Sequence, residues 1–186
     1  SFPLINTSSG TNFGIAWYRC TSLTSFPLID TSSGTSFSQA WQVCTSLTSF
    51  PLIDTSSGTN FDRAWSTCSS LTSFPLINTS SGTKFTKAWN NCTNLVTFPA
   101  GFFDNWSPTT VGNQCFVDTW RGCSSLSATS VENILNSIDT SGQSAPASGV
   151  DITIDYDTGS GTPNISTAVA NLKSRNWTIT LNGVAQ

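Results

Sequence analysis

A 24-residue unit recurs almost unchanged through most of the sequence, and it limits the folds that the chain can adopt. Cysteine marks the period at Cys20, Cys44, Cys68 and Cys92, and at Cys123 in an irregular fifth copy. Tryptophan stands three residues earlier in each copy, at Trp17, Trp41, Trp65, Trp89 and Trp120. Self-similarity at this period indicates a solenoid, in which each repeat buries its apolar face against its neighbours. We therefore expect the tryptophans and cysteines to form a core ladder.

One unit, residues 26–49, reads FPLIDTSSGTSFSQAWQVCTSLTS. Its apolar residues Phe37, Ala40, Trp41 and Cys44 have the i, i+3, i+4, i+7 spacing of one helix face. An extended segment follows at 47–50, where the next proline opposes a helix. We expect each unit to be a short strand, a turn and a short helix, so that stacked units form a parallel sheet on one side and helices on the other.

The cysteines occupy one equivalent position in the repeat, apart from Cys115. Free cysteine behaves as a small buried hydrophobic residue, so this position predicts a ladder of buried thiols. A disulfide between Cys115 and a member of the ladder stays open.

The repeat changes after its fourth copy. The fifth unit contains an insertion at 100–115, and from residue 126 the repeat is lost. Helical spacing at 131–138 and 165–172, with strand patterns at 150–156 and 177–181, predicts a capping segment that covers the last core layer. We expect a five-unit solenoid at 1–125 and a C-terminal cap at 126–186.

The segments AWQVCTSLTSFP and AWSTCSSLTSFP resemble the aromatic-x-x-Cys-x-x-Leu signature of BspA-like leucine-rich-repeat surface proteins. Trp41 and Trp65 stand where that family commonly has Phe, and Phe-Pro replaces its Leu-x-Leu strand core. The tail VENILNSI…VDITIDY…ISTAVANLKSRNWTITLNG resembles the closing module of leucine-rich-repeat proteins on bacterial surfaces and phage tail fibres. The resemblance implies an α/β leucine-rich-repeat solenoid with short parallel strands, short helices and an α/β cap. It also implies adhesion or receptor binding on a cell surface or virion.

Comparison of the copies with one another separates constant from variable positions. The segment FPLI(N/D)TSSGT hardly changes, whereas the positions between the core residues of the predicted helix differ freely. On a helix they would point away from the core, which predicts a recognition surface on a constant scaffold; neutral drift of exposed positions is the alternative. The candidate binding residues are Tyr18, Arg19, Gln39, Gln42, Asp62, Arg63, Lys84, Lys87, Asn90, Asp118 and Arg121.

Other binding modes and a purely structural role remain open. The tryptophans could stack on sugars, although their spacing favours a core role. Constant threonine ranks such as Thr31, Thr55 and Thr79 could form hydroxyl ladders that bind ice or a crystalline polysaccharide; the alternative is that they satisfy local hydrogen bonds. The repeats could also serve only as a spacer in a fibre.

Composition argues against several classes of function. Charged residues make up 9% of the chain and the net charge is -3, which disfavours nucleic acid binding. No apolar run is long enough for direct membrane insertion. The chain has no His and no CxxC motif, which disfavours zinc and removes the commonest general base. We expect a non-enzymatic extracellular protein without cofactor or metal, whose partner is a cell-surface glycan or protein receptor.

Two carboxylate groupings remain as minor candidates. Asp104 and Asp118 near the insertion could form a glycosidase-like pair, and the alternating Asp151, Asp155 and Asp157 weakly suggest calcium.

Oligomerisation within a fibre or surface layer is left open. Phe2 aligns with Phe26, so the chain begins inside a repeat and we expect it to be a piece of a longer protein.

Overall fold

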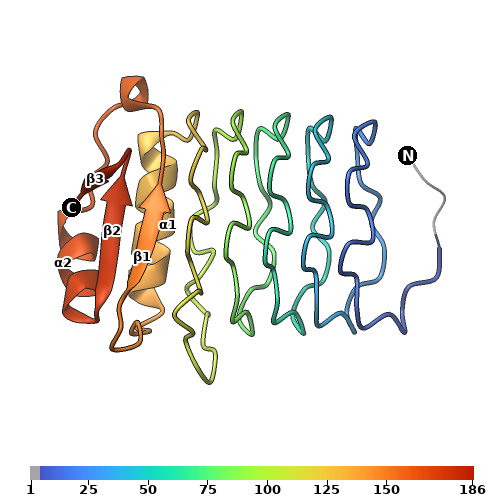
Figure 1. The fold of residues 1–186 in the computed structure, drawn as a ribbon, viewed down its shortest axis with the longest axis horizontal. Helices are drawn as coiled ribbons and strands as arrows, with labels where there is room; N and C mark the ends of the chain where they lie inside the picture. The colour runs from blue at the N-terminus through green and yellow to red at the C-terminus, as the bar shows by residue number, and fades with distance from the viewer. Residues whose placement is uncertain (1–4) are drawn as a thin grey trace.

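The computed structural model describes residues 5–186 (Figure 1). The repeats stack as successive coils along one axis, and the C-terminal segment lies at one end of the stack (Figure 1). Phe2, on which the expectation of a truncated first repeat depends, lies outside the described residues.

Backbone hydrogen bonds connect each coil to the next one along the chain. The N–H groups of Phe37, Gln39 and Trp41 each donate, at 2.8 Å, to a carbonyl 23 residues further on. The first and third units repeat this pattern. Isolated parallel bridges, such as Ser36 with Asn60, add to the pairing between coils. The coils are therefore joined by backbone pairing as well as by their side chains.

The short helices that the spacing predicts in each repeat do not form. Among the described residues, the first α-helix begins at Ala128, and the repeat segments consist of consecutive turns. Gln39 and Val43 have φ of 57° and 64°, which lies outside the right-handed helical region. Many N–H groups that a helix would use internally are instead bonded to the neighbouring coil. The short strands are likewise reduced to isolated bridges.

The aromatic residues of successive coils stack in columns. The ring centroids of Trp41 and Trp65 are 5.5 Å apart with an interplanar angle of 4°, and those of Trp65 and Trp89 are 5.3 Å apart. Edge-on contacts to Phe50 and Phe74 surround Trp65 at 5.3 and 4.8 Å. These rings are buried, so the face that the helical spacing selected is the core although the element is not a helix.

The cysteines form a second column. The Cys68 thiol donates to the Trp41 carbonyl of the preceding coil at 3.2 Å, and the contact recurs along the stack. All six cysteines are free thiols, and all except Cys20 are buried. Burial raises the pKa of Cys44 to about 11 and that of Cys123 to about 12. Cys20 departs from the expected ladder, because within the described residues no coil covers the outer side of its own.

The constant turn of the repeat is explained by packing and local hydrogen bonds. A Cβ on Gly58 would lie 2.5 Å from Phe61 Cζ, so only glycine leaves room for the ring. Thr55 is buried and its hydroxyl donates to the Asn78 carbonyl at 2.6 Å. The Asp54 carboxylate accepts from the Ser56 N–H at 2.9 Å and closes an Asx turn. Constancy of this turn therefore needs no functional explanation.

The C-terminal segment contains regular helices and strands. They are α1 (Ala128–Thr140), β1 (Val150–Ile154), the 3-10 turn η1 (Thr158–Ser160), α2 (Ser166–Ser174), β2 (Trp177–Leu181) and β3 (Val184–Ala185). Strands β1 and β2 pair in parallel, with α2 in the connection between them, and β3 pairs antiparallel with β2. The Ser127 hydroxyl caps α1 by accepting from the Ser130 N–H. The spacing predicted α1, α2, β1 and β2 correctly, although β1 ends at Ile154, and it did not predict η1 or β3.

The C-terminal segment continues the hydrogen bonding of the last coil. Ile154 forms a parallel bridge with Trp120, and the Asp155 side chain accepts from the Gly122 N–H at 2.8 Å. The Ser130 hydroxyl donates to the Val96 carbonyl at 2.9 Å. Side chain and backbone of this segment thus cover the end of the stack.

Candidate functional site

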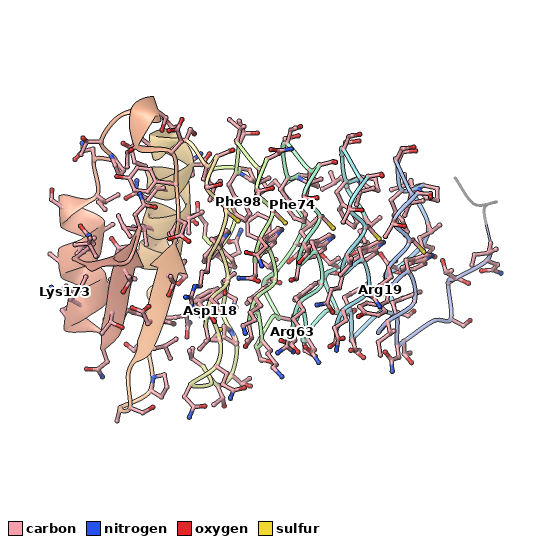
Figure 2. The ribbon with its side chains drawn as sticks, turned by 45° about the horizontal axis from the view of Figure 1, so that its top comes forward. Arg19, Arg63, Phe74, Phe98, Asp118 and Lys173 are labelled. Carbon is pink, nitrogen blue, oxygen red and sulfur yellow. The ribbon has the colours of Figure 1, made fainter. Side chains whose placement is uncertain are left out.

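The variable positions of the repeat lie on one side of the coils. Figure 2 shows Arg19, Arg63 and Asp118 spaced along the stack. Each coil contributes two residues with positive φ to this variable face, one two residues after its Phe and one two residues after its Trp. We use the name variable face for these positive-φ residues together with the other candidate binding residues, which are Tyr18, Gln42, Asp62, Lys84, Asn90 and Arg121.

The residues at the left-handed positions are unusual for that conformation. They include Ile15 at φ 62°, Val43 at 64° and Thr67 at 62°, all of them β-branched. Left-handed geometry costs an L-residue with a Cβ on the order of 1–2 kcal/mol, and glycine and asparagine adopt it most easily. The positions are Ile15, Arg19, Gln39, Val43, Arg63, Thr67, Lys87, Asn91, Asp118 and Gly122.

The C-terminal segment has different residue types at its left-handed positions. Among the described residues after 127, the only side chains with positive φ other than glycine are Asn176 and Asn182. The stack also places easily accommodated residues at left-handed positions, as at Asn91 and Gly122, but it fills most of these positions with residues that are strained there. Selection for stability alone would favour glycine or asparagine on the variable face as well.

Charged residues of the variable face pair between coils. Asp62 Oδ2 lies 2.8 Å from Arg63 Nη1 and 3.9 Å from Lys84 Nζ. A second group joins Asp118 to Lys87 at 3.7 Å and to Arg121 at 3.4 Å. The paired side chains lie on three successive coils, and the more exposed pairs of Asp118 contribute little stability. Their partly exposed cations are the groups most available to a partner.

The remaining candidates have few contacts. The Arg19 guanidinium lies 5.8 Å from the centre of the Tyr18 ring, and both residues are exposed. Asn90 donates from its amide to the Arg121 carbonyl at 2.9 Å, which links two coils. Gln39 and Gln42 are half-buried.

Asp62 contradicts the expectation that every variable residue points outward. It is 6% exposed, and its Oδ1 atom has no hydrogen-bond partner in the described part of the chain. Ser66 and Thr86, two further variable residues, are also buried. In the third and fourth coils the residue directly after Phe is buried, which the expectation of an outward helix face did not foresee. Asp62 therefore positions Arg63 and Lys84 instead of contacting a partner directly.

The tryptophans and threonines that the alternative binding modes would use are buried or hydrogen-bonded within the stack. Trp41, Trp65 and Trp89 are fully buried, so their faces cannot stack on a sugar. The hydroxyl ladder of Thr31, Thr55 and Thr79 is also buried and donates to carbonyls of the following segment. The outer ladders use their hydroxyls in the same way, as in Thr59 to Thr35 O at 3.1 Å. The structure satisfies these hydroxyls internally.

The aspartates of the C-terminal segment are used in local hydrogen bonds. Asp151 accepts from Thr178 and Thr180 at 3.0 Å each and from Thr153 at 2.6 Å. In residues 5–186, no group of three or more His, Cys, Asp or Glu side chains could hold a metal ion. The suggested calcium site is not assembled. At the insertion, Asp118 is paired with Lys87 and Arg121 rather than with a second carboxylate.

Sequence reasoning missed a column of exposed leucines. Leu28, Leu52 and Leu76, which the pattern placed beside an expected core strand, are 66%, 63% and 53% exposed. Their constancy across copies is the signal that could have identified them, because packing in the core does not explain why an exposed leucine recurs. Leu76 also borders a cavity beside the insertion.

Comparison of the chain with family models, curated proteins and solved structures gave no match. No helix within residues 5–186 has both the length and the apolar character needed to cross a membrane.

Proposed function

We propose that the chain is a non-enzymatic extracellular recognition module, which binds a cell-surface glycan or protein through the variable face of its repeats. In this proposal the stack is a leucine-rich-repeat solenoid of the surface-protein type, and residues 126–186 form its cap. The supporting fold observation is the coil-to-coil pairing together with stacked Trp and Cys columns.

A single observation carries the functional proposal. Seven of the ten left-handed positions of the variable face hold Ile, Val, Thr, Arg, Lys or Gln, although glycine or asparagine, which stand at Gly122 and Asn91, would cost less. Drift under selection for stability would remove such residues. Their retention at a cost in stability is expected if their side chains contact a partner.

The test is the triple variant Gln39→Gly, Arg63→Gly and Lys87→Gly, measured on a glycan array and on a panel of intact cells. All three positions have φ between 52° and 57°, so glycine fits the backbone, and the melting temperature of the variant verifies that loss of the Arg63–Asp62 and Lys87–Asp118 ion pairs does not unfold the stack. We expect target binding to be lost by at least about tenfold, since several side chains are removed together. Binding equal to that of the wild type would overturn the proposal.

A matched control uses one repeat position outside the candidate binding residues, which is serine in the first three copies and Asn94 in the fourth. Ser22, Ser46 and Ser70 make no side-chain hydrogen bond within the described residues, and their replacement by alanine should leave binding unchanged. Exchanging units 26–49 and 50–73 separates recognition from a spacer role. A spacer tolerates the exchange, whereas an ordered recognition surface loses its target.

A further inference from the structure

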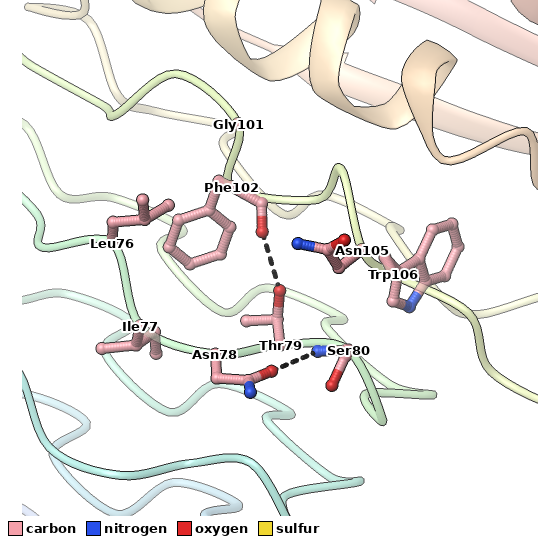
Figure 3. Close-up of a pocket in the computed structure, with 9 residues that line it drawn as sticks. All are labelled: Leu76, Ile77, Asn78, Thr79, Ser80, Gly101, Phe102, Asn105 and Trp106. Carbon is pink, nitrogen blue, oxygen red and sulfur yellow. Dashed lines mark hydrogen bonds between the residues drawn. The ribbon is translucent and has the colours of Figure 1, made fainter.

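A cavity opens where the insertion interrupts the regular stack. Its volume is about 360 Å³, within the range of small-molecule sites. One wall is formed by residues 76–80 of the fourth coil, and the other by Gly101, Phe102, Asn105 and Trp106 of the insertion (Figure 3).

The departure of the fifth unit from the repeat accounts for the cavity. Ala100 and Gly101 replace the Leu-Ile pair of the regular unit, and Gly101 has φ of 71°, which glycine adopts without strain. The small Ala100 and Gly101 fill less space than the Leu-Ile pair, and Gly101 lines the cavity beside the exposed Leu76 of the fourth coil.

Hydrogen bonds on both sides of Asn105 fix the insertion to the fourth coil. The Thr79 hydroxyl donates to the Phe102 carbonyl at 3.0 Å, and the Trp106 indole N–H donates to the Gly82 carbonyl at 2.6 Å. Phe102 and Trp106 are buried. The cavity is therefore preformed, which lowers the entropy cost of binding.

The lining is neutral and carries free hydrogen-bonding groups. Asn78 Oδ1 accepts from the Ser80 N–H at 3.0 Å, which leaves its amide nitrogen available. The exposed Asn105 side chain makes no hydrogen bond within residues 5–186, so it offers both a donor and an acceptor. Leu76 supplies an exposed apolar edge. No lining residue is charged, so a charged ligand would lose hydration without a counter-charge.

We propose that this cavity binds one neutral sugar unit of a glycan. A sugar ring presents hydroxyl groups at its periphery, for Asn78 and Asn105, and C–H faces that match Leu76. None of the lining residues belongs to the variable face. The site is therefore separate from the proposed recognition surface and does not depend on it.

Repeat symmetry supplies variants with matched controls. Asn78→Asp keeps the turn, since Asp54 makes the same bond at 2.9 Å, but it removes the amide donor and adds a negative charge. Its control is Asn6→Asp, at the same repeat position and outside the cavity. Leu76→Ala removes the apolar edge, and Leu52→Ala removes an equally exposed leucine of the same column that does not line the cavity.

The experiment is saturation-transfer difference NMR with the full chain. The probes are free glucose, galactose, mannose and N-acetylglucosamine at millimolar concentration, with glucuronic acid as the charged probe. We expect at least one neutral sugar to bind, and glucuronic acid to bind more weakly. Asn78→Asp and Leu76→Ala should each weaken binding by about tenfold, while both controls bind as the wild type does.

Three outcomes would overturn the site. They are no neutral sugar binding to the wild type, stronger binding of glucuronic acid, or equal loss in the cavity variants and their controls. The melting temperature of each variant verifies that a loss of binding does not reflect unfolding.

Discussion

The repeat stack and the C-terminal cap satisfy their backbones in different ways. In the stack, Phe61 and Arg63 donate to the fourth coil at 2.8 and 2.9 Å, so one coil supplies the partners of another. In the cap, α1 and α2 close their hydrogen bonds internally, and β1 pairs with β2. A single coil has no partner of its own, so the stack is stable only as an array.

The two regions also differ in the residues that they place at left-handed positions. The cap uses glycine and asparagine, as at Asn176 and Asn182, whereas the stack uses residues such as Ile15 and Arg63. The cap therefore carries little strain at its left-handed positions, whereas most of those in the stack hold side chains that cost stability there.

Loss of one indole should disrupt the stack strongly. Trp65 is fully buried between Trp41 and Trp89, so Trp65→Ala leaves a large cavity and should cost about 3–5 kcal/mol of unfolding free energy. Denaturant unfolding measures the change.

Two further variants give a control for this prediction. Trp65→Phe should lower the unfolding free energy less than Trp177→Phe does, because the Trp65 indole N–H is unpaired whereas that of Trp177 donates to the Gln143 carbonyl at 2.9 Å. The reverse order would contradict the described packing.

Alkaline pH should weaken the stack through its buried thiols. Burial raises the pKa of Cys44 from 9.0 to about 11 and that of Cys123 to about 12. A folded-state pKa above the unfolded one gives stability that is complete below pH 9 and is lost as pH rises toward those values. Urea unfolding under reducing conditions from pH 7 to 11 measures the loss.

Thiol labelling gives the control for this prediction. Only the exposed Cys20 should react quickly at pH 8, and the buried cysteines should react after denaturation. Cys44→Ala should reduce the alkaline loss of stability. A stability profile that stays flat to pH 11, or fast labelling of several thiols, would show that the cysteine column is not buried.

Exchange of residue types at left-handed positions should shift stability in opposite directions. Ile15 is exposed at φ 62°, so Ile15→Asn should raise the unfolding free energy by about 1 kcal/mol. Asn176→Ile, at φ 66° in the cap, should lower it by a similar amount. Thermal unfolding measures both. If Ile15→Asn destabilises, the isoleucine has a structural role and the argument for a retained binding side chain fails at that position.

The smallest effect concerns one turn of the stack. Hydrogen bonds from the Ser32 side chain and N–H lower the pKa of Asp30 below its ordinary 3.8. A lowered folded-state pKa gives stability that is present above the unfolded pKa and is lost as pH falls through the folded one. Asp30→Asn keeps the turn acceptor, as Asn78 shows, and should slightly reduce the loss of stability below pH 4. Unfolding at pH 2–5 checks this, and an unchanged acid limb would mean that the turn does not depend on the charge.

Much of the core followed from the sequence. The spacing of Phe37, Ala40, Trp41 and Cys44 selected buried residues correctly, yet it assigned them to a helix that does not form. The same spacing at 131–138 was correct about α1, because there the N–H groups find acceptors within the segment. A pattern of apolar residues shows which side chains are buried and leaves open how the backbone is paired.

The candidate sites could be predicted from the sequence less completely than the core. Variation between copies selected the variable face, but it could not show that Asp62 is buried or that Ile15 and Val43 are strained. The cavity beside Leu76 depends on where the insertion folds, and nothing in the order of residues 100–115 gives that position.

The period, the identity of the core residues and most of the helices and strands of residues 128–181 follow from the amino-acid sequence, because they depend on local spacing and on side-chain burial. The folded stack adds that alternate N–H groups of each repeat bond to the next coil while the others close turns within their own coil, and hence which side chains stand at left-handed positions. Those bonds join residues 23 positions apart, and their acceptors exist only once the neighbouring coil is in place.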